Sequence, residues 1–243
     1  MDRPKLSVVI PAYNEETRLG PTLEKLAEFF KQVPYEVEII VVDDGSSDGT
    51  FELARSFEPK FANMRTIKNE HNMGKGGAVK RGMISANGEF RLFYDADGST
   101  PIEEIENAWR YLDSGYDAVI GSRALDPSKL EVPQPFLRRF AGMVFRWMVW
   151  ILVVPGFRDT QCGFKVFSAR ATEAIFRRQR LTGFGFDVEL LFLARKLGFK
   201  VKEMPVVWRD SAFSTVKLPR DAIRMFREIL SIRWNQLLGR YRF

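Results

Sequence analysis

Short apolar runs alternate with longer amphipathic segments along the first half of the chain. Leu6–Ile10 is a β-branched run that Pro11 ends, which predicts a buried strand, and Glu15–Phe30 carries apolar residues at helical spacing. Four further strands are predicted at Val37–Val42, Met64–Ile67, Phe90–Tyr94 and Asp117–Ile120, and three further helices at Ser47–Phe57, Lys75–Ala86 and Pro101–Leu112. Such alternation predicts an α/β fold with a mostly parallel, doubly wound sheet.

The pattern changes after Gly121. Ser122–Pro135 is a polar loop with three prolines, and the next residues, to Val154, are strongly apolar and aromatic. Phe164–Trp208 predicts a strand-helix-strand region, and Pro219–Leu238 a basic amphipathic helix. No change in composition marks a linker. We expect a catalytic domain at residues 1–218, with an apolar interfacial segment at 136–155, followed by a membrane-associating helix at 219–243.

Two segments have the composition of membrane-surface helices. Phe140–Val154 is apolar but carries Arg146, so the pattern fits an interfacial helix and a buried core helix equally well. The C-terminal helix has an apolar face that includes Trp234, with arginines around it. No run reaches the roughly 18 to 20 apolar residues of a spanning helix, and the N-terminus has no signal-peptide pattern. We therefore expect peripheral attachment.

The amino-acid composition indicates which classes of molecule the protein binds. The formal charge of +6 and a pI near 9.5 favour anionic partners: nucleic acid, nucleotide phosphates or acidic lipid headgroups. Cys162 and His71 are the only residues of their types. They permit no intrachain disulfide and no zinc site of the usual kind, and we interpret both as structural.

Three predicted strands end in acidic or polar loops. The first runs into Tyr13 and Glu15, the second into Asp43 and Asp44, and the fourth into Asp95-Ala96-Asp97. The carboxyl ends of parallel strands meet at one edge of the sheet. Carboxylates gathered there cost free energy unless a cation is bound. Asp95 and Asp97 are therefore the predicted ligands of Mg²⁺ or Mn²⁺.

These motifs, in this order and over nearly the whole chain, resemble the family 2 glycosyltransferases with the GT-A fold. Within the family they resemble the branch that acts on dolichyl and polyprenyl phosphates, and the runs Asp159–Lys165 and Phe186–Leu191 resemble its glucosyl members more than its mannosyl members. The other motifs that carry the resemblance are Pro11–Glu15, Asp43–Ser46, Asn72–Gly76, Asp95–Asp97 and Gly121–Arg123.

The resemblance implies an inverting transfer of a sugar, glucose in the first place, from a nucleotide sugar to a polyprenyl or dolichyl phosphate. UDP-glucose is the favoured donor and GDP-mannose the alternative. The residues implied in donor binding are Pro11, Tyr13 and Glu15 at the nucleoside, Asp44 at the base, Gly74, Lys75 and Gly76 near the phosphates, and Asp95, Ala96 and Asp97 at ribose, metal and diphosphate. Those implied at the acceptor and the sugar are Arg123, Arg138, Gln161, Glu189 and Lys217, with Asp159 and Asp187 beside them.

A phosphate acceptor is already ionised near neutral pH, so catalysis would consist of positioning and electrostatics, without a general base. The catalytic set is then Asp95, Asp97, Arg123, Asp159 and Asp187. Two positions depart from the family pattern: Ser99 stands where some relatives have Gln, and Thr215 stands where relatives often have Lys, so that Lys217 is the candidate replacement.

Three alternatives remain open. The acceptor is a carbohydrate hydroxyl, which needs a base; the enzyme transfers mannose; or the chain is an inactive module that binds nucleotides or nucleic acid. The intact Asp95-Ala96-Asp97 motif and the lack of aromatic-basic repeats argue against the last, and we expect no nucleic-acid partner. The expected location is the cytoplasmic face of a membrane.

Overall fold

The computed structural model of the protein describes residues 3–125, 149, 153–209 and 218–241, with residues 218–224 described by their backbone alone. The strands are β1 (Leu6–Ala12), β2 (Val37–Asp43), β3 (Met64–Lys68), β4 (Phe90–Tyr94), β5 (Ala118–Ser122), β6 (Phe164–Ser168) and β7 (Val201–Pro205). The helices are α1 (Glu16–Phe30), α2 (Thr50–Phe57), α3 (Lys75–Ser85), α4 (Glu104–Leu112), α6 (Ala169–Arg178), α7 (Phe186–Lys196) and α8 (Leu218–Leu237), with a 3-10 turn η1 (Glu58–Lys60).

All these strands form one sheet in the order β3-β2-β1-β4-β6-β5-β7. The pairs β1 with β2, β1 with β4, β2 with β3 and β5 with β7 are parallel. Strand β6 runs antiparallel to both of its neighbours, β4 and β5. The predicted α/β class and mostly parallel sheet are confirmed, and β6 is the exception to the parallel direction.

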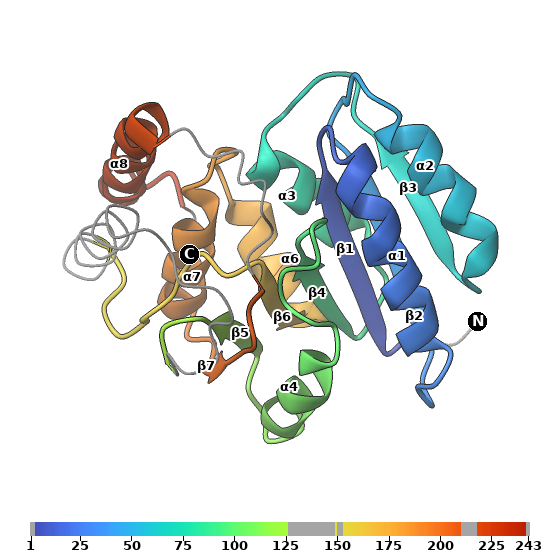
Figure 1. Ribbon diagram of the computed structural model, residues 1–243. Coiled ribbons are helices and arrows are strands. Elements are labelled where there is room, and N and C mark those ends of the chain that lie inside the picture. Colours follow the sequence, from blue (N-terminus) through green and yellow to red (C-terminus); the bar gives the residue numbers. More distant parts are fainter. Residues whose placement is uncertain (1–2, 126–148, 150–152, 210–217, 242–243) are drawn as a thin grey trace.

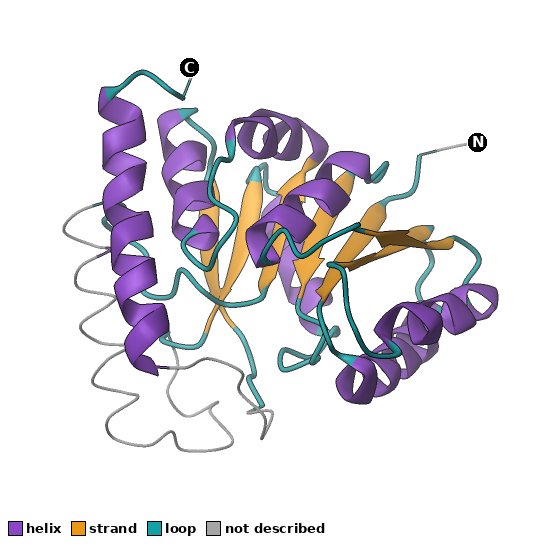
Figure 2. Cartoon of the chain, turned by 90° about the horizontal axis from the view of Figure 1, so that it is seen from above, coloured by secondary structure: helices purple, strands orange, loops and turns teal. Residues whose placement is uncertain are grey.

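Helices cover both faces of the sheet (Figures 1 and 2). Successive side chains of a strand point to opposite faces, so Val8 and Leu92 join one apolar cluster and Val9 and Phe93 the other. The first cluster is completed by α1, α2 and α4, and the second by α3, α6, α7 and α8. Because both faces are buried, the central strands are apolar along nearly their whole length.

The second half of the chain differs in detail from the sequence prediction. Two helices, α6 and α7, separate β6 from β7, where one was expected. The break between them, residues 179–185, contains Gly183 and Gly185, and glycine weakens a helix interior. Helix α4 begins at Glu104, after a turn, so Pro101 precedes the helix by a turn of chain instead of opening it.

Helix α8 was expected as a separate membrane-associating segment. Its inward residues Ile229 and Ile232, and Tyr241 after it, are buried in the same cluster as α7. Most of the predicted apolar segment 136–155 lies outside the described residues, but Val149, Val153 and Val154 are buried in that cluster too. Among the described residues, no helix combines the length and the apolar character needed to cross a bilayer.

Candidate active site

A cavity of about 550 Å³ opens where β1, β2, β4 and β5 end. Its walls come from the residues that follow these strands, from residues 72–75 and 78 at the start of α3, from Arg18 of α1, and from residues 161, 163, 183–184 and 208. The predicted site residues that line it are Pro11, Tyr13, Glu15, Asp44, Gly74, Lys75, Asp95, Ala96, Asp97, Arg123 and Gln161. The sheet topology thus gathers, at one edge, motifs that lie far apart in the sequence.

The loop after β1 is held in an uncommon backbone conformation. Asn14 has a positive φ of 54°, which is rare for a residue other than glycine. Its amide accepts a hydrogen bond from the Ser47 backbone N–H at 2.9 Å, and its own N–H donates to the Ser46 hydroxyl at 3.0 Å. These bonds tie the β1 loop to the β2 loop and leave the Tyr13 side chain 48% exposed at the cavity.

Glu15 contributes a carboxylate to the same side of the cavity. Arg18 donates to both of its oxygens, at 2.5 and 2.6 Å. Burial nevertheless raises the pKa of Glu15, and the neighbouring charges of Asp97 and Asp95 raise it further. The carboxylates of Glu15, Asp95 and Asp97 therefore lie close enough to repel one another, as expected of a site that binds a cation.

Asp44 shapes the glycine loop that precedes α3. Its carboxylate is almost fully buried and accepts hydrogen bonds from the Asn69 amide at 2.6 Å and from the backbone N–H groups of Met73 and Gly74, both at 2.9 Å. Gly74 has a φ of 86°, which favours glycine, and a side chain there would meet the Thr182 carbonyl. Asp44 thus fixes the loop as well as facing the cavity.

Asp95 and Asp97 stand at the end of β4. Lys75 lies at the first residue of α3, with its ammonium 2.7 Å from Oδ1 of Asp95. Burial alone would lower the pKa of Lys75, but Asp95 and Asp187 outweigh it and raise this pKa. Asp97 accepts a hydrogen bond from the Ser99 backbone N–H at 3.0 Å. One cation and two carboxylates therefore share this end of the cavity.

Gly163 backs Asp95 directly. Its carbonyl accepts a hydrogen bond from the Asp95 backbone N–H at 3.0 Å, and any side chain at position 163 would run into the Asp95 carboxylate. Glycine at position 163 therefore lets the Asp95 carboxylate keep this position, and a larger residue would displace it.

The donor set suits a divalent cation of the Mg²⁺ or Mn²⁺ kind. Within the described ranges, no three His, Cys, Asp or Glu side chains are grouped so as to hold a metal by themselves. Mg²⁺ commonly takes one or two protein carboxylates and completes its shell with water and substrate phosphates. Asp95 and Asp97 meet that requirement.

Arg123 lies just beyond β5 and is held from behind by Asp159. Its Nε and Nη2 donate to the two Asp159 oxygens at 2.7 and 3.0 Å, and its backbone N–H donates at 3.0 Å. Burial alone would raise the pKa of Asp159, but the guanidinium outweighs it and holds this pKa well below its usual range. The Arg123 side chain keeps 29% of its surface exposed and lines the cavity, with its guanidinium carbon 5.6 Å from the centre of the Trp208 ring.

Glu189 and Gly76 were expected to contact substrates, and Asp159 and Asp187 to take part in catalysis beside them, but none of the four lines the cavity. Asp187 is buried against Lys165, whose Nζ lies 2.5 Å from Oδ1. Glu189 is fully buried and accepts hydrogen bonds from the backbone N–H groups of Arg180 and Leu181, at 3.0 and 2.8 Å. Burial raises the pKa of both carboxyls. Their positions favour support of the site over direct contact with a ligand.

Some lining residues were not predicted. Arg18 holds Glu15, Trp208 packs by Arg123, and Gly183 and Phe184 close one side of the cavity. Arg18 lies one helical turn from Glu15, a spacing that permits the pair, whereas Trp208 and Phe184 come from distant loops and carry no local signal. The predicted acceptor residues Arg138 and Lys217 lie outside the described residues.

Comparison with known proteins identifies the family. The model of Glycosyl transferase family 2 matches residues 7–181, most of the chain. The chain belongs to glycosyl transferase family 2. It is therefore a glycosyltransferase, and the motif resemblance is confirmed.

Curated members of this family align over almost the whole chain. Dolichyl-phosphate beta-glucosyltransferase of Dictyostelium discoideum is 38% identical, over 98% of this chain and 77% of the relative. The proteins of the same name from Saccharomyces cerevisiae and Homo sapiens are 35% and 34% identical, each over 98% of this chain and over 76% and 78% of their own lengths.

Solved structures share the fold at lower identity. Glucosyl-3-phosphoglycerate synthase from Mycobacterium tuberculosis in complex with UDP has a TM-score of 0.71 at 20% identity, over 94% of this chain and 80% of that one. The same synthase has also been crystallised with Mn²⁺, UDP and glucosyl-3-phosphoglycerate. These likenesses confirm the GT-A fold expected for this family 2 enzyme.

Proposed function

We propose that this family 2 enzyme transfers glucose from UDP-glucose to a dolichyl or other polyprenyl phosphate, with inversion, at a membrane surface. The observation that carries the proposal is the cavity itself, which is lined both by acidic residues at the strand ends and by Arg123. The names of the curated relatives, which match nearly the whole chain, support the same sugar and acceptor.

The donor occupies the side formed by β1, β2 and α3. Pro11, Tyr13 and Glu15 contact the nucleoside, and Asp44 the edge of the base. Gly74 and Lys75 open α3, and the N-terminus of a helix favours an anion such as the diphosphate. Gly76, which lies behind the cavity lining, keeps the backbone of this turn close to its neighbours.

Asp95 and Asp97 hold the divalent cation, Mg²⁺ or Mn²⁺, with Ala96 between them against the donor. When bound, the cation stabilises the charge that develops on the departing nucleoside diphosphate. Lys75 is close enough to Asp95 to turn toward the same phosphates.

The acceptor phosphate lies at Arg123. Asp159 accepts hydrogen bonds from two N–H groups of the guanidinium and thereby fixes its plane. A guanidinium carries five N–H donors, so others of its N–H groups can bind phosphate oxygens in this proposal. Gln161 lines the cavity next to them and contacts the sugar or the phosphate. Arg138 and Lys217 complete the acceptor site in this proposal.

The attacking oxygen of a phosphate monoester needs no general base. Among the described residues, the carboxylate side chains that line the cavity are Glu15, Asp44, Asp95 and Asp97, and this proposal assigns them to the donor and the cation. Asp187 is paired with Lys165 and supports the floor of the site. A hydroxyl acceptor, which needs a base, is for this reason the weaker alternative.

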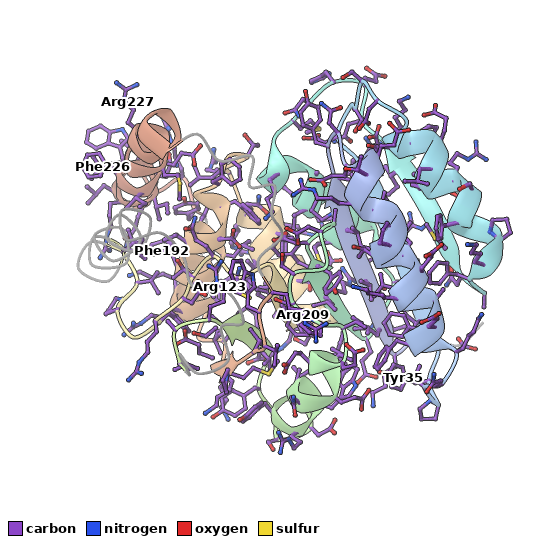
Figure 3. All side chains as sticks on the ribbon, in the orientation of Figure 1. Tyr35, Arg123, Phe192, Arg209, Phe226 and Arg227 are labelled. Carbon is purple, nitrogen blue, oxygen red and sulfur yellow. The ribbon has the colours of Figure 1, made fainter. Side chains whose placement is uncertain are left out.

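The outer face of α8 is the proposed membrane contact. Exposed large apolar side chains gather there: Phe226, Leu230, Trp234, Leu237 and the adjacent Leu238. In the parts of the chain that the structure describes, the other two exposed large apolar residues, Tyr13 and Met73, line the cavity. Arg227 and Arg233 flank the apolar stripe, and Figure 3 shows Phe226 and Arg227 pointing outward from α8.

An apolar stripe with arginines beside it matches the interface of an anionic bilayer. We place the enzyme on the cytoplasmic face of a membrane, because a nucleotide-sugar donor and a lipid-phosphate acceptor meet at such a surface.

A donor and acceptor screen tests the function. UDP-glucose, UDP-galactose and GDP-mannose are each incubated with a short polyprenyl phosphate and Mn²⁺, and the lipid product is measured. We expect a glucosyl lipid from UDP-glucose alone, and no product after chelation of the metal. Transfer from GDP-mannose would select the mannosyl alternative, and transfer to a sugar hydroxyl without use of the lipid phosphate would contradict the proposal.

A further inference from the structure

Residues 179–185, between α6 and α7, form one wall of the cavity and are called the wall segment below. Gly183 and Phe184 face the cavity directly. The wall segment also supports the glycine-rich first turn of α3: the Gly76 N–H donates to the Thr182 carbonyl at 2.8 Å, and the Gln179 amide donates to the Gly76 carbonyl at 2.8 Å. The position of the wall segment therefore affects the position of Gly74, Lys75 and Gly76, the residues proposed to lie near the donor phosphates.

Glu228 of α8 fixes the far end of the wall segment. Its Oε2 accepts a hydrogen bond from the Gly185 backbone N–H at 2.7 Å. The packing is close, because a side chain at Gly183 or at Gly185 would collide with Glu228. Glu228 thus reaches from α8 to the backbone immediately behind the cavity wall.

The chain after α8 fixes the near end. The Tyr241 hydroxyl donates to Oε1 of Glu189 at 2.5 Å, while Oε2 of Glu189 accepts from the backbone of the wall segment at Leu181. The Arg180 guanidinium donates to the Arg240 carbonyl at 3.2 and 3.0 Å. The C-terminal residues therefore hold the wall segment at both of its ends.

From these contacts we infer that Glu228 and Tyr241 are positioning residues, through which α8 and the chain after it hold the wall segment and the glycine-rich start of α3 in the geometry that binds the nucleoside diphosphate of the donor. The inference rests on the proposed function only for the place of the donor. Its consequence is that the helix with the proposed membrane face is also part of the donor site.

Binding of UDP to the purified full-length enzyme, with Mn²⁺ and without lipid, tests the inference by calorimetry. Glu228→Ala removes the acceptor for Gly185, and we expect the Kd for UDP to rise about tenfold, or about 1.4 kcal/mol. Glu228→Gln keeps an oxygen that accepts the same hydrogen bond, so its Kd should stay within about threefold of wild type. Glu28→Ala, which removes an exposed carboxylate from α1, is the matched control and should bind UDP as wild type does.

The KM and kcat of Glu228→Ala distinguish a role of Glu228 in positioning the donor site from a role in stabilising the fold alone. We expect Glu228→Ala to raise the KM for the nucleotide sugar more than it lowers kcat, at a temperature well below its Tm. A lower Tm with unchanged UDP affinity and unchanged KM would overturn the inference, since Glu228 would then only stabilise the fold.

Tyr241→Phe serves if Glu228→Ala does not fold. It keeps the aromatic ring against Phe192 and removes only the hydroxyl that holds Glu189. We expect the Kd for UDP to rise about threefold, and an unchanged Kd would contradict the inference. Because UDP binding involves neither glucose nor lipid, these results are independent of the acceptor. If the donor screen selects GDP-mannose, GDP replaces UDP as the probe.

Discussion

Gly163 shows how a single residue controls the placement of the predicted metal ligand. Its Cα faces the Asp95 carboxylate so closely that even a methyl group would overlap it. The backbone N–H of Asp95 is at the same time bonded to the Gly163 carbonyl, so Asp95 cannot move away as a unit without losing that bond. The carboxylate must therefore rotate or shift if the glycine is replaced.

We predict that Gly163→Ala lowers kcat by about a hundredfold, because displacement of a catalytic group by about 1 Å has an effect of that size. The fold should survive, since the change adds only a methyl group next to a cavity. Activity is measured with saturating donor and acceptor, together with the Tm. Gly156→Ala offers a control at another glycine of the same region with open space around it, although its positive φ adds some strain. Near-normal turnover of Gly163→Ala would show that Asp95 is not needed in this position.

The sequence identified individual residues of the site more readily than the side chains with which those residues pair in the fold. Asp95 and Asp97 were identifiable because a polar Asp-x-Asp follows an apolar strand. Lys75 was expected near the phosphates, but its ion pair with Asp95 joins α3 to β4 and has no local signature. Asp187 and Glu189 were expected at the substrate because they belong to the Phe186–Leu191 run that carries the family resemblance. The structure buries both, each with partners brought in by the fold: Lys165, Tyr241 and the wall segment.

At the scale of elements, the first half of the fold was predictable. Strand β4 was expected at its observed bounds, and α1 within one residue, because apolar runs and helical spacing are strong local signals. The reversed direction of β6 was not predictable, since strand direction depends on which neighbours a strand pairs with. One helix was expected between β6 and β7, and the break at residues 179–185 that divides it into α6 and α7 was not predicted.

The Arg123–Asp159 pair joins elements that the sequence keeps apart. Asp159 lies in the loop before β6, and its backbone N–H donates to Glu203 of β7 at 2.7 Å. Arg123 follows β5. The pair and this hydrogen bond together connect the loop to two adjacent strands, so we expect it to contribute to stability as well as to orient the guanidinium.

We predict that Asp159→Asn lowers the free energy of unfolding by about 1 to 3 kcal/mol at pH 7, less than for a fully buried pair because Arg123 is partly exposed. The pKa of Asp159 is depressed in the folded protein, so the ionised form stabilises the fold. This contribution is complete at pH values well above the ordinary Asp pKa of about 3.9 and is lost as the pH falls below it.

Urea unfolding at pH 7, 5 and 3.5 measures how much Asp159→Asn lowers the free energy of unfolding at each pH. The difference between wild type and Asp159→Asn should be the same at pH 7 and 5 and smaller at pH 3.5. Asp113→Asn, at an exposed carboxylate after α4, should stay within about 0.5 kcal/mol of wild type at pH 7. A difference that grows as the pH falls would have the wrong sign for a stabilising Asp159 carboxylate.

At the scale of the whole molecule, α8 connects the proposed membrane face with the catalytic core. Its inner residues Ile229 and Ile232 are buried, and its outer residues Leu230 and Trp234 are 44% and 60% exposed. Removal of residues 219–243 would therefore expose core side chains and remove Glu228 from the wall segment. A truncation cannot separate membrane binding from catalysis, but substitutions on the outer face can.

Substitutions on the outer face of α8 can remove membrane binding without disturbing the buried inner face of the helix. Leu230→Glu combined with Trp234→Glu places two charges on the outer face and leaves Glu228, Ile229 and Ile232 in place. We predict that wild type sediments with anionic vesicles at low salt, and that 1 M salt releases only part of it, because the Debye length falls to about 3 Å while the apolar contribution persists. The double variant should remain in the supernatant at every salt concentration.

The activity of the double variant should depend on whether the acceptor is held in a membrane. The double variant should lose activity toward a long-chain lipid phosphate in vesicles and keep it toward a water-soluble short-chain analogue, since the cavity at the ends of β1, β2, β4 and β5 is unchanged. Gln32→Glu with Ser56→Glu adds the same two charges at exposed positions near α1 and on α2, and should bind vesicles as wild type does. If both double variants lose vesicle binding alike, added negative charge explains the loss and the apolar face of α8 does not. If wild type ignores anionic vesicles at low salt, α8 is not a membrane contact, and the exposed stripe of Phe226, Leu230, Trp234 and Leu237 must be covered by something other than lipid.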